Sequence, residues 1–291
     1  MSKNNSKIVK SLLLIILNFS FFIFNSCTAP IDIETDDSLP VISIFGSFTD
    51  ELKQQSVTVS VSSPYFDNQP NRALSGATVE VSTSNGDVFM LVEDPVNPGR
   101  YQTQNEVAGV PGTTYKLIVK ADINNDGVQE SYSVTSTMPT IMTVDSIRIK
   151  SVSAMGKQSY ELSVYAQDPL TEDYYLGIYE INGLLMDKIS KYSILNDEMF
   201  NGQYMNSWAL GKFGTMDDDD DRMRLKSGDV VILHFSRIEK GYYYFIQQCR
   251  NGMNGESPFG GPASNIVTNI SGGGVGYFTA YAVSKTTAVV E

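Results

Sequence analysis

Residues 77–92, with the sequence ATVEVSTSNGDVFMLV, decide the fold class of this chain. Polar and apolar residues alternate over 77–81, and a second run rich in strand-forming residues covers 88–92. Asn85-Gly86-Asp87 lies between them and has the residue types that tight turns require. Alternation with a period of two is typical of strands that bury one face. The stretch therefore predicts two β-strands joined by a turn.

Similar short runs lie on both sides of this stretch. They share β-branched or aromatic residues at alternate positions, and they cover residues 41–45, 57–61, 115–119 and 132–135. Turn chemistry separates them, as at Pro98-Gly99-Arg100 and Pro111-Gly112. Six or seven short strands in about 100 residues are typical of an immunoglobulin-like β-sandwich. We expect such a sandwich over residues 40–140.

The rest of the chain, residues 141–291, predicts a second, β-rich domain with one helix. Alternating runs continue at 146–150 and 160–165, and 174–179 forms an aromatic strand pattern. Ser236 and Glu239 have the spacing of a capping box, which predicts a helix that begins at this point. The expected helix covers residues 242–250, before the stop signal Asn251-Gly252. The predicted fold is mostly β.

The N-terminal stretch has the features of an export signal. Lys3, Lys7 and Lys10 precede an apolar run over 12–24, which is shorter than the about 20 residues of a spanning helix. Cys27 follows at the expected cleavage point. This pattern predicts a lipoprotein signal peptide at 1–26, with Cys27 acylated as the mature N-terminus. Plain secretion and an uncleaved anchor are the alternatives.

An acidic tether is expected at residues 27–39. The stretch after Cys27 is polar and contains four acidic residues, Asp32, Glu34, Asp36 and Asp37. The whole chain has 33 acidic against 21 basic residues and a net charge of −12. Binding to nucleic acid depends on clustered Lys and Arg, so we expect no nucleic-acid partner. Lipidation of Cys27 leaves Cys249 as a lone thiol, which a buried apolar position explains best.

Sequence motifs of catalysis are weak in this chain. His234 is the single histidine, so a site with several histidines cannot be built, and the sequence identifies no nucleophile for it. A structural role inside an apolar strand is therefore favoured for His234. Carboxylates are numerous, but no spacing singles out a glycosidase-like pair. We predict that the protein is not an enzyme, and a hydrolase is the least favoured of three functional classes.

One loop has the opening pattern of a calcium site. Asp122, Asn124 and Asp126 supply oxygens at alternate positions, and Gly127 permits the sharp turn. Position 12 of such a loop is Ser133, where an EF-hand needs a bidentate Glu. A hairpin turn is therefore the favoured interpretation, and calcium binding is the alternative. No cofactor is expected, with calcium in this loop as the alternative.

Two further segments attract attention as contact regions. Five consecutive acids at 217–221 are typical of a solvated loop, and a cation or a basic partner is the alternative. Phe200, Tyr204 and Trp208 belong to an aromatic-rich, loop-rich region. Such residues contact a ligand or a protein when exposed, and form core when buried. Trp208 is the first candidate for ligand contact among the three.

The chain resembles the Bacteroidota lipoprotein family catalogued as domain of unknown function 4249 (DUF4249). The resemblance rests on short pieces in a common order: residues 46–50, 62–67, 75–79, 98–101, 109–115, 196–202, 227–230, 257–259 and 272–278. It implies an envelope lipoprotein, often encoded near TonB-dependent outer-membrane transporters. It implies no established chemistry and no catalytic residues. In such bacteria, acids just after the lipidated Cys favour export to the cell surface.

The expected function is a non-enzymatic binding or accessory role beside a TonB-dependent nutrient transporter. The expected location is the surface face of the outer membrane, through a lipid anchor on Cys27, with the periplasmic face as the alternative. A surface adhesion or structural module is the leading alternative function, because a sandwich without a pocket would suit it.

Overall fold

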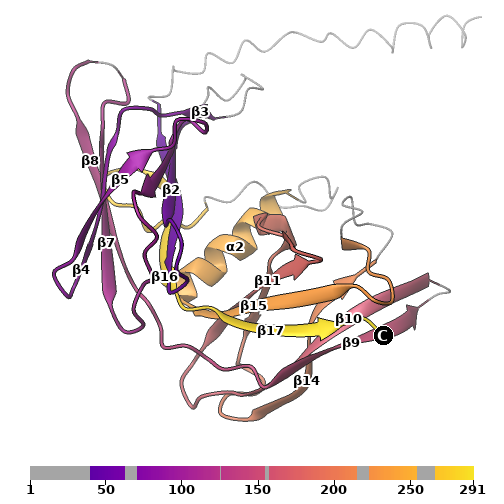
Figure 1. Cartoon of the computed structure of the whole chain (residues 1–291). Helices are drawn as coiled ribbons and strands as arrows, with labels where there is room; N and C mark the ends of the chain where they lie inside the picture. Colours follow the sequence, from indigo (N-terminus) through magenta and orange to yellow (C-terminus); the bar gives the residue numbers. More distant parts are fainter. Residues whose placement is uncertain (1–39, 63–70, 125, 155–156, 215–222, 254–265) are drawn as a thin grey trace, which may run out of the picture. The chain divides into compact units, whose positions relative to one another are not determined.

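The computed structural model describes residues 40–291 except 63–70, 125, 155–156, 215–222 and 254–265. Most of the described chain forms β-strands, and one α-helix lies among them (Figure 1). The predicted mostly β fold with one helix is confirmed. No helix in these described ranges has the length and apolar character needed to cross a bilayer.

The first sheet has nine strands, eight of which follow one continuous hydrogen-bonded path. Their bounds are β1 (Ile42–Thr49), β2 (Ser56–Val61), β3 (Arg72–Ala73), β4 (Thr78–Thr83), β5 (Val88–Glu93), β6 (Arg100–Thr103), β7 (Thr114–Ala121), β8 (Glu130–Thr137) and β16 (Val275–Tyr281). The path runs β16-β1-β2-β6-β5-β4-β7-β8, and β3 pairs with β2.

The two ends of this path approach each other. The Ala280 amide on β16 donates to the Ser136 hydroxyl on β8 at 2.8 Å, and the Ser271 amide donates to the Ser133 carbonyl at 3.0 Å. The sheet therefore curls around its core like an incomplete barrel. A continuous path of this kind does not confirm the immunoglobulin-like detail, which requires two separate sheets.

The predicted alternation is visible in the burial of the strands. In β7 the side chains of Tyr115, Leu117 and Val119 are buried, and the residues between them are more exposed. Val79 and Val81 of β4 are fully buried in the same core. The hairpin predicted from residues 77–92 forms as β4 and β5, with Gly86 in the turn at φ 96°.

The second half of the chain contains two smaller sheets. One has the order β14-β10-β9, and the other has the order β12-β11-β15-β17 with β13 paired to β11. The bounds are β9 (Ser146–Ala154), β10 (Lys157–Gln167), β11 (Tyr174–Ile181), β12 (Leu184–Leu185), β13 (Ser193–Asn196), β14 (Tyr204–Phe213), β15 (Val230–Ile238) and β17 (Ser284–Val289). A short 3-10 helix covers Ile189–Lys191, and α2 covers Lys240–Met253.

β11 is buried on both faces, which explains its aromatic sequence. Tyr175 and Tyr179 belong to the core shared by the two smaller sheets. Leu176 and Ile178 face a second core, which contains Tyr242 of α2. Buried aromatic side chains of this size contribute much of the apolar area that such cores remove from water.

The helix α2 begins one turn away from the capping signal in the sequence. Ser236 lies in β15 and does not cap the helix, because β15 extends to Ile238. The carbonyl of Glu239 accepts the first helical bonds, while its side chain accepts from the Thr137 amide at 3.0 Å. The capping-box prediction is therefore wrong, although the predicted helix itself is confirmed.

β16 connects segments that are distant in the sequence. It pairs in parallel with β1, with Ser43 opposite Val275 and Thr49 opposite Tyr281. Phe278 and Ala280 lie in the core of the first sheet, whereas Tyr277 lies in the core beneath α2. Figure 1 shows the chain leaving β16 and continuing as β17 in another sheet.

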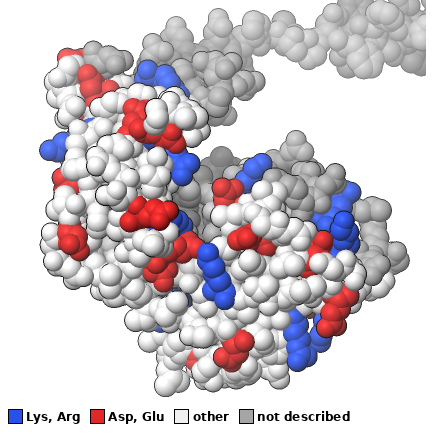
Figure 2. Space-filling model, viewed as in Figure 1, with Lys and Arg blue, Asp and Glu red and all other residues white. Residues whose placement is uncertain are grey.

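This pairing bears on the expected division at residue 140. β16 belongs to the segment 141–291, yet it forms part of the sheet that residues 40–140 otherwise build. Residues 39–291 form one compact unit by their contacts. On the face shown in Figure 2, acidic and basic side chains are interspersed among uncharged ones.

Candidate functional site

A cavity of about 160 Å³ lies beside His234. Several elements converge on it: β1 and the segment after it, strands β11, β12, β15 and β16, and the residues on either side of the 3-10 helix. Its lining residues are Ser47, Glu51, Lys53, Ile178, Leu185, Asp187, Tyr192, His234, Ser236, Tyr281 and Val283. A wider groove of about 750 Å³ lies between β9 and β17, but only those two strands and the chain end line it. The smaller cavity gathers polar groups from more elements, so we take it as the candidate site.

The segment that carries Glu51 is held by Gln55. The Gln55 side chain is 1% exposed, and its Nε2 donates to the carbonyls of Thr49, Glu51 and Val107 at 3.1, 3.0 and 2.7 Å. Its Oε1 accepts from the Thr49 amide at 3.0 Å. A buried amide with its hydrogen bonds satisfied fixes the backbone around it. The position of Glu51 is therefore set before any ligand arrives.

Glu51 accepts hydrogen bonds from two lysines. Lys53 Nζ and Lys285 Nζ each lie 2.7 Å from a Glu51 carboxylate oxygen. Burial alone would raise the pKa of Glu51, but the hydrogen bonds and charges of Lys285 and Lys53 outweigh it and lower the pKa to about 2. Glu51 is therefore ionised at neutral pH, and its charge is balanced within the network.

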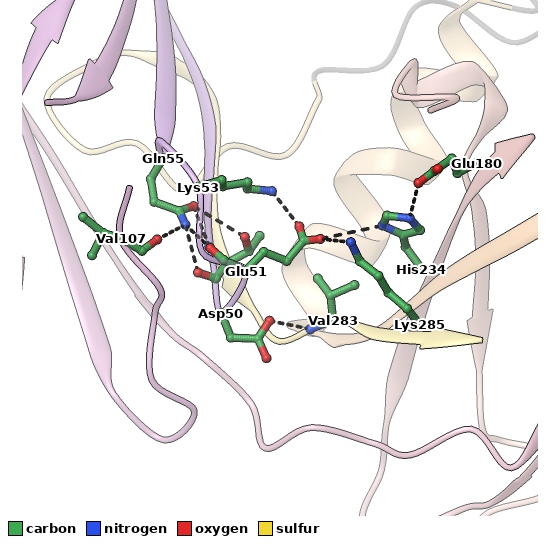
Figure 3. A network of polar contacts seen from close by, with 10 residues as sticks. Asp50, Glu51, Lys53, Gln55, Val107, Glu180, His234, Val283 and Lys285 are labelled. Carbon is green, nitrogen blue, oxygen red and sulfur yellow. Dashed lines mark hydrogen bonds and ion pairs between the residues drawn. The ribbon is translucent and has the colours of Figure 1, made fainter. Parts of the chain in front are cut away.

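His234 joins this network from β15. Its Nε2 lies 3.1 Å from Glu180 Oε2, and its Nδ1 lies 3.9 Å from Glu51 Oε1 (Figure 3). Burial and the charge of Lys285 lower the pKa of His234, so the ring is neutral at pH 7. The contact with Glu180 assigns the proton to Nε2, which leaves Nδ1 as a hydrogen-bond acceptor.

Two tyrosines contribute ring surface to the cavity. Tyr192 and Tyr281 are 8% and 7% exposed, and burial raises the pKa of both hydroxyls. The Tyr192 hydroxyl donates to the Asp187 carbonyl at 3.0 Å, which fixes the ring. The cavity thus combines apolar walls with an acceptor on His234 and the ion pairs of Glu51. This combination is typical of small-molecule sites.

Three buried aspartates converge at a different place. Asp168, Asp173 and Asp197 each offer a carboxylate oxygen within 4.8 Å of the others. Asp168 accepts from the Tyr175 hydroxyl and from the Gly202 amide at 2.8 Å. The sequence gives no signal for this group, because its members come together through tertiary pairing: β11 with β13 brings Asp173 to Asp197, and β10 with β14 places Asp168 beside the same loop.

The remaining carboxylates of this group are also held by the protein. Asp173 forms an ion pair with Arg237, whose Nε donates at 2.9 Å, and accepts from the Thr171 hydroxyl. Asp197 accepts from the Asp173 amide at 2.8 Å. Burial raises the pKa of Asp197. Protein donors thus occupy each of the three carboxylates, and we interpret the group as a structural clamp between loops.

The three predicted contact aromatics differ in exposure: Phe200 lies in the loop before β14, Tyr204 begins β14 and Trp208 lies within it. Phe200 is 3% exposed and belongs to the core, and Trp208 is half-buried against it, with ring centroids 4.4 Å apart. Tyr204 is 47% exposed. Ligand contact by these residues stays a prediction, and exposure places Tyr204 ahead of Trp208 as the accessible ring.

The loop of Asp122, Asn124 and Asp126 connects β7 to β8. Asp122 accepts from the Gly127 amide at 2.9 Å and the Asp126 amide at 3.2 Å, and Asp126 accepts from the Val128 amide at 2.7 Å. Asn124 donates to the Asp126 carboxylate at 2.9 Å. These bonds are those of a polar turn, and calcium binding there stays a prediction.

Other predicted features lie elsewhere. Cys27 and the acidic run 217–221 fall outside the described residues. Cys249 is half-buried beside the core beneath α2, and burial raises the pKa of its thiol. A raised pKa reduces the thiolate fraction, which agrees with a packing role for Cys249.

A comparison with models of known protein families assigns the chain to one family. The family model described as "Domain of unknown function (DUF4249)" matches residues 28–287. The chain belongs to the DUF4249 family. No curated protein matches this DUF4249 chain significantly.

Among solved structures, a crystal structure of a Salmonella alpha-2-macroglobulin mutant is similar to part of the DUF4249 chain, with 13% identity and a TM-score of 0.22. The match covers 70% of this chain and 14% of that one. At this TM-score the likeness carries no argument about fold or function.

Proposed function

We propose that this DUF4249 protein is an outer-membrane lipoprotein with a non-enzymatic binding role, accessory to a TonB-dependent nutrient transporter. The basic start, short apolar run and Cys27 support a lipid anchor at the N-terminus. Family resemblance supports the transporter as partner. Acidic residues after Cys27 support exposure on the cell surface.

The observation that carries the binding role is the preorganised cavity at His234. Gln55 fixes the segment of Glu51, two lysines fix the Glu51 carboxylate, and Glu180 fixes the imidazole. Groups fixed before binding lose little conformational entropy when a ligand arrives, which favours affinity. Neutral His234 offers an acceptor to a ligand N–H or O–H group.

The size of the cavity limits the ligand. Its volume is about 160 Å³. An engineered protein cavity of about 150 Å³ holds benzene, so this one suits a group of about one six-membered ring. We propose that the cavity binds a small polar ring, or the end group of a larger ligand.

The arrangement around His234 supports recognition rather than hydrolysis. A catalytic imidazole needs a nucleophile within hydrogen-bond reach. Within the described residues, the polar contacts recorded for His234 are with carboxylates, at Glu180 and Glu51. Both groups are acceptors, and neither directs the ring toward a hydroxyl or thiol.

Affinity purification of the tagged protein from detergent-solubilised outer membranes tests the proposal. We expect a TonB-dependent barrel in near-stoichiometric amount, identified by mass spectrometry. The control is Cys27→Ala, which should release the protein from the membrane fraction and abolish palmitate labelling. Continued labelling of Cys27→Ala would refute the anchor. Purification of the wild type alone would refute the transporter role and favour an adhesion module.

A further inference from the structure

Two adjoining loops expose large apolar side chains to solvent. They are residues 168–173, before β11, and residues 197–204, which lead into β14. Leu170 is 89% exposed, Met199 is 79% exposed and Tyr204 is 47% exposed. Single exposed apolar residues are common, but three on two hydrogen-bonded segments are a candidate interaction site.

Hydrogen bonds hold the two loops together. The Asp168 amide donates to the Gln203 carbonyl at 3.1 Å, and the Gly202 amide donates to the Pro169 carbonyl at 3.0 Å. The Gly202 amide also donates to the Asp168 carboxylate at 2.8 Å. The buried aspartate clamp therefore fixes the backbone beneath the exposed side chains.

Leu170 packs against the neighbouring loop at Gly202. A Cβ atom at Gly202 would lie 2.5 Å from Leu170 Cδ2, so the absence of a side chain there leaves room for Leu170. Leu170 thus rests on the second loop while most of its surface stays in water. A rigid base with exposed apolar tips needs little further ordering when a partner binds.

The charge of these two loops indicates whether a membrane or a protein binds the exposed apolar side chains. The segments 168–173 (DPLTED) and 197–204 (DEMFNGQY) contain five carboxylates and no Lys or Arg. Glu172 pairs with Lys240 at 2.9 Å and Asp173 pairs with Arg237, whereas Glu198 is exposed. Asp168, Asp173 and Asp197 are buried, so Glu198 supplies the negative charge at the exposed surface of the loops. An anionic bilayer surface repels this charge, whereas Lys or Arg residues of a protein partner attract it.

We propose that Leu170, Met199 and Tyr204 dock into an apolar pocket of a protein partner, and that Lys or Arg residues surround this pocket. The inference rests on the proposed accessory function, because it supplies the contact surface for the partner. Leu170 and Met199 enter the pocket, and Glu198 meets the basic rim. Central apolar anchors inside a polar rim are the usual anatomy of such interfaces.

Site-specific photo-crosslinking in cells tests the proposal. A photo-reactive phenylalanine analogue replaces Met199 in the full chain, and the control carries it at Val96, which is 81% exposed on a different loop. We expect position 199 to crosslink to one protein, at a peptide that contains apolar residues next to Lys or Arg. Crosslinks to lipid, to a peptide without Lys or Arg, or equally from both positions would overturn the proposal.

Substitutions separate this inference from the proposed function. Leu170→Ser with Met199→Ser, and separately Glu198→Lys, should lower co-purification of the crosslinked protein at least tenfold, whereas Val96→Ser should leave it unchanged. Circular dichroism checks that each variant is folded. If a TonB-dependent barrel co-purifies equally with wild type and variants, the docking surface is wrong and the accessory function stands. If no protein co-purifies with the wild type, both fail.

Discussion

Glu51 shows how neighbouring side chains decide the charge of a half-buried carboxylate. Burial favours its neutral form, yet Lys285 and Lys53 hold it ionised. Because its pKa of about 2 in the folded state lies below the usual 4.5, the ionised form stabilises the fold above about pH 4.5. That contribution declines as the pH falls from 4.5 toward 2.

Replacement of Glu51 by Gln therefore has a pH-dependent effect. Glu51→Gln should lower the free energy of unfolding at pH 7 by about 1 to 3 kcal/mol, because charge-assisted hydrogen bonds are lost. The difference from wild type should shrink as the pH approaches 3. Urea unfolding at both pH values measures it, with exposed Glu106→Gln as the control. An equal difference at pH 7 and pH 3 would contradict the assignment.

Gln55 carries more of the local structure than its neighbour Gln54. Gln55→Leu keeps the side-chain volume but leaves the carbonyls of Thr49, Glu51 and Val107 without their donor. We expect a loss of at least about 2 kcal/mol, since each buried unpaired group costs about 1 to 3 kcal/mol.

The matched control is Gln54→Leu, because Gln54 is exposed and donates to the carbonyls of Thr103 and Gln104. Its effect should stay below about 1 kcal/mol in the same urea titration. Equal losses for the two variants would show that Gln55 does not hold the loop.

The sequence predicted some features of the candidate site and missed others. Its preference for a structural role at His234 followed from the apolar strand around the residue. The cavity could not be predicted, because Glu51 and Lys285 meet His234 only through long-range strand pairing. The same holds for Asp168 and Asp197, which no local pattern connects.

At the scale of elements, alternation was the reliable signal. Strands such as β4 and β7 follow it because one face of each is buried in the core. The predicted start of α2 was wrong, because the pairing of β15 with β11 keeps Ser236 in an extended strand, opposite Leu176. Tertiary pairing outweighed a local capping preference that is worth only about 1 kcal/mol.

The glycines at the start of β16 give a test of its parallel pairing with β1. A Cβ at Gly276 would lie 2.1 Å from the Ile44 carbonyl oxygen, and its φ is 108°. Gly273 has φ 84°, but nothing lies within 4 Å of a Cβ there. Gly273→Ala should cost about 1 to 3 kcal/mol from backbone strain alone.

Gly276→Ala should cost at least about 2 kcal/mol more than Gly273→Ala, because β16 must move away from β1 to relieve the overlap. Thermal and urea unfolding measure both variants. If the two variants have the same stability, the close approach of β16 to β1 is not present in solution.

At the scale of the whole molecule, the position of β16 in the first sheet predicts that residues 40–140 are not stable on their own. The segment 40–140 lacks Phe278 and Ala280, which belong to the core of its sheet. Expressed alone, it should unfold at a lower urea concentration than residues 39–291, or fail to give dispersed amide signals in NMR spectra. An isolated segment as stable as the longer chain would support the domain boundary near residue 140.

Fold class was accessible from sequence at this scale, whereas topology was not. The structure has β16 at Val275–Tyr281, and nothing in the local sequence specifies which strand it pairs with. Its pairing with β1 depends on a contact between opposite ends of the chain. The expected sandwich becomes one continuous sheet because β6 pairs with both β2 and β5, and alternation does not predict these pairings either.

The parallel pair of β1 and β16 has a consequence for the order of events during synthesis. The amide of Val283 bonds to the Asp50 carboxylate across 233 residues of chain. At a translation rate of about 5 to 20 residues per second, β1 leaves the ribosome on the order of 10 to 50 seconds before its partner. Contacts between residues that are so far apart in the sequence slow folding. During that interval the edge of β1 that pairs with β16 has no partner strand. An unpaired strand edge can pair with another chain, so we expect chaperone binding to matter most at this stage.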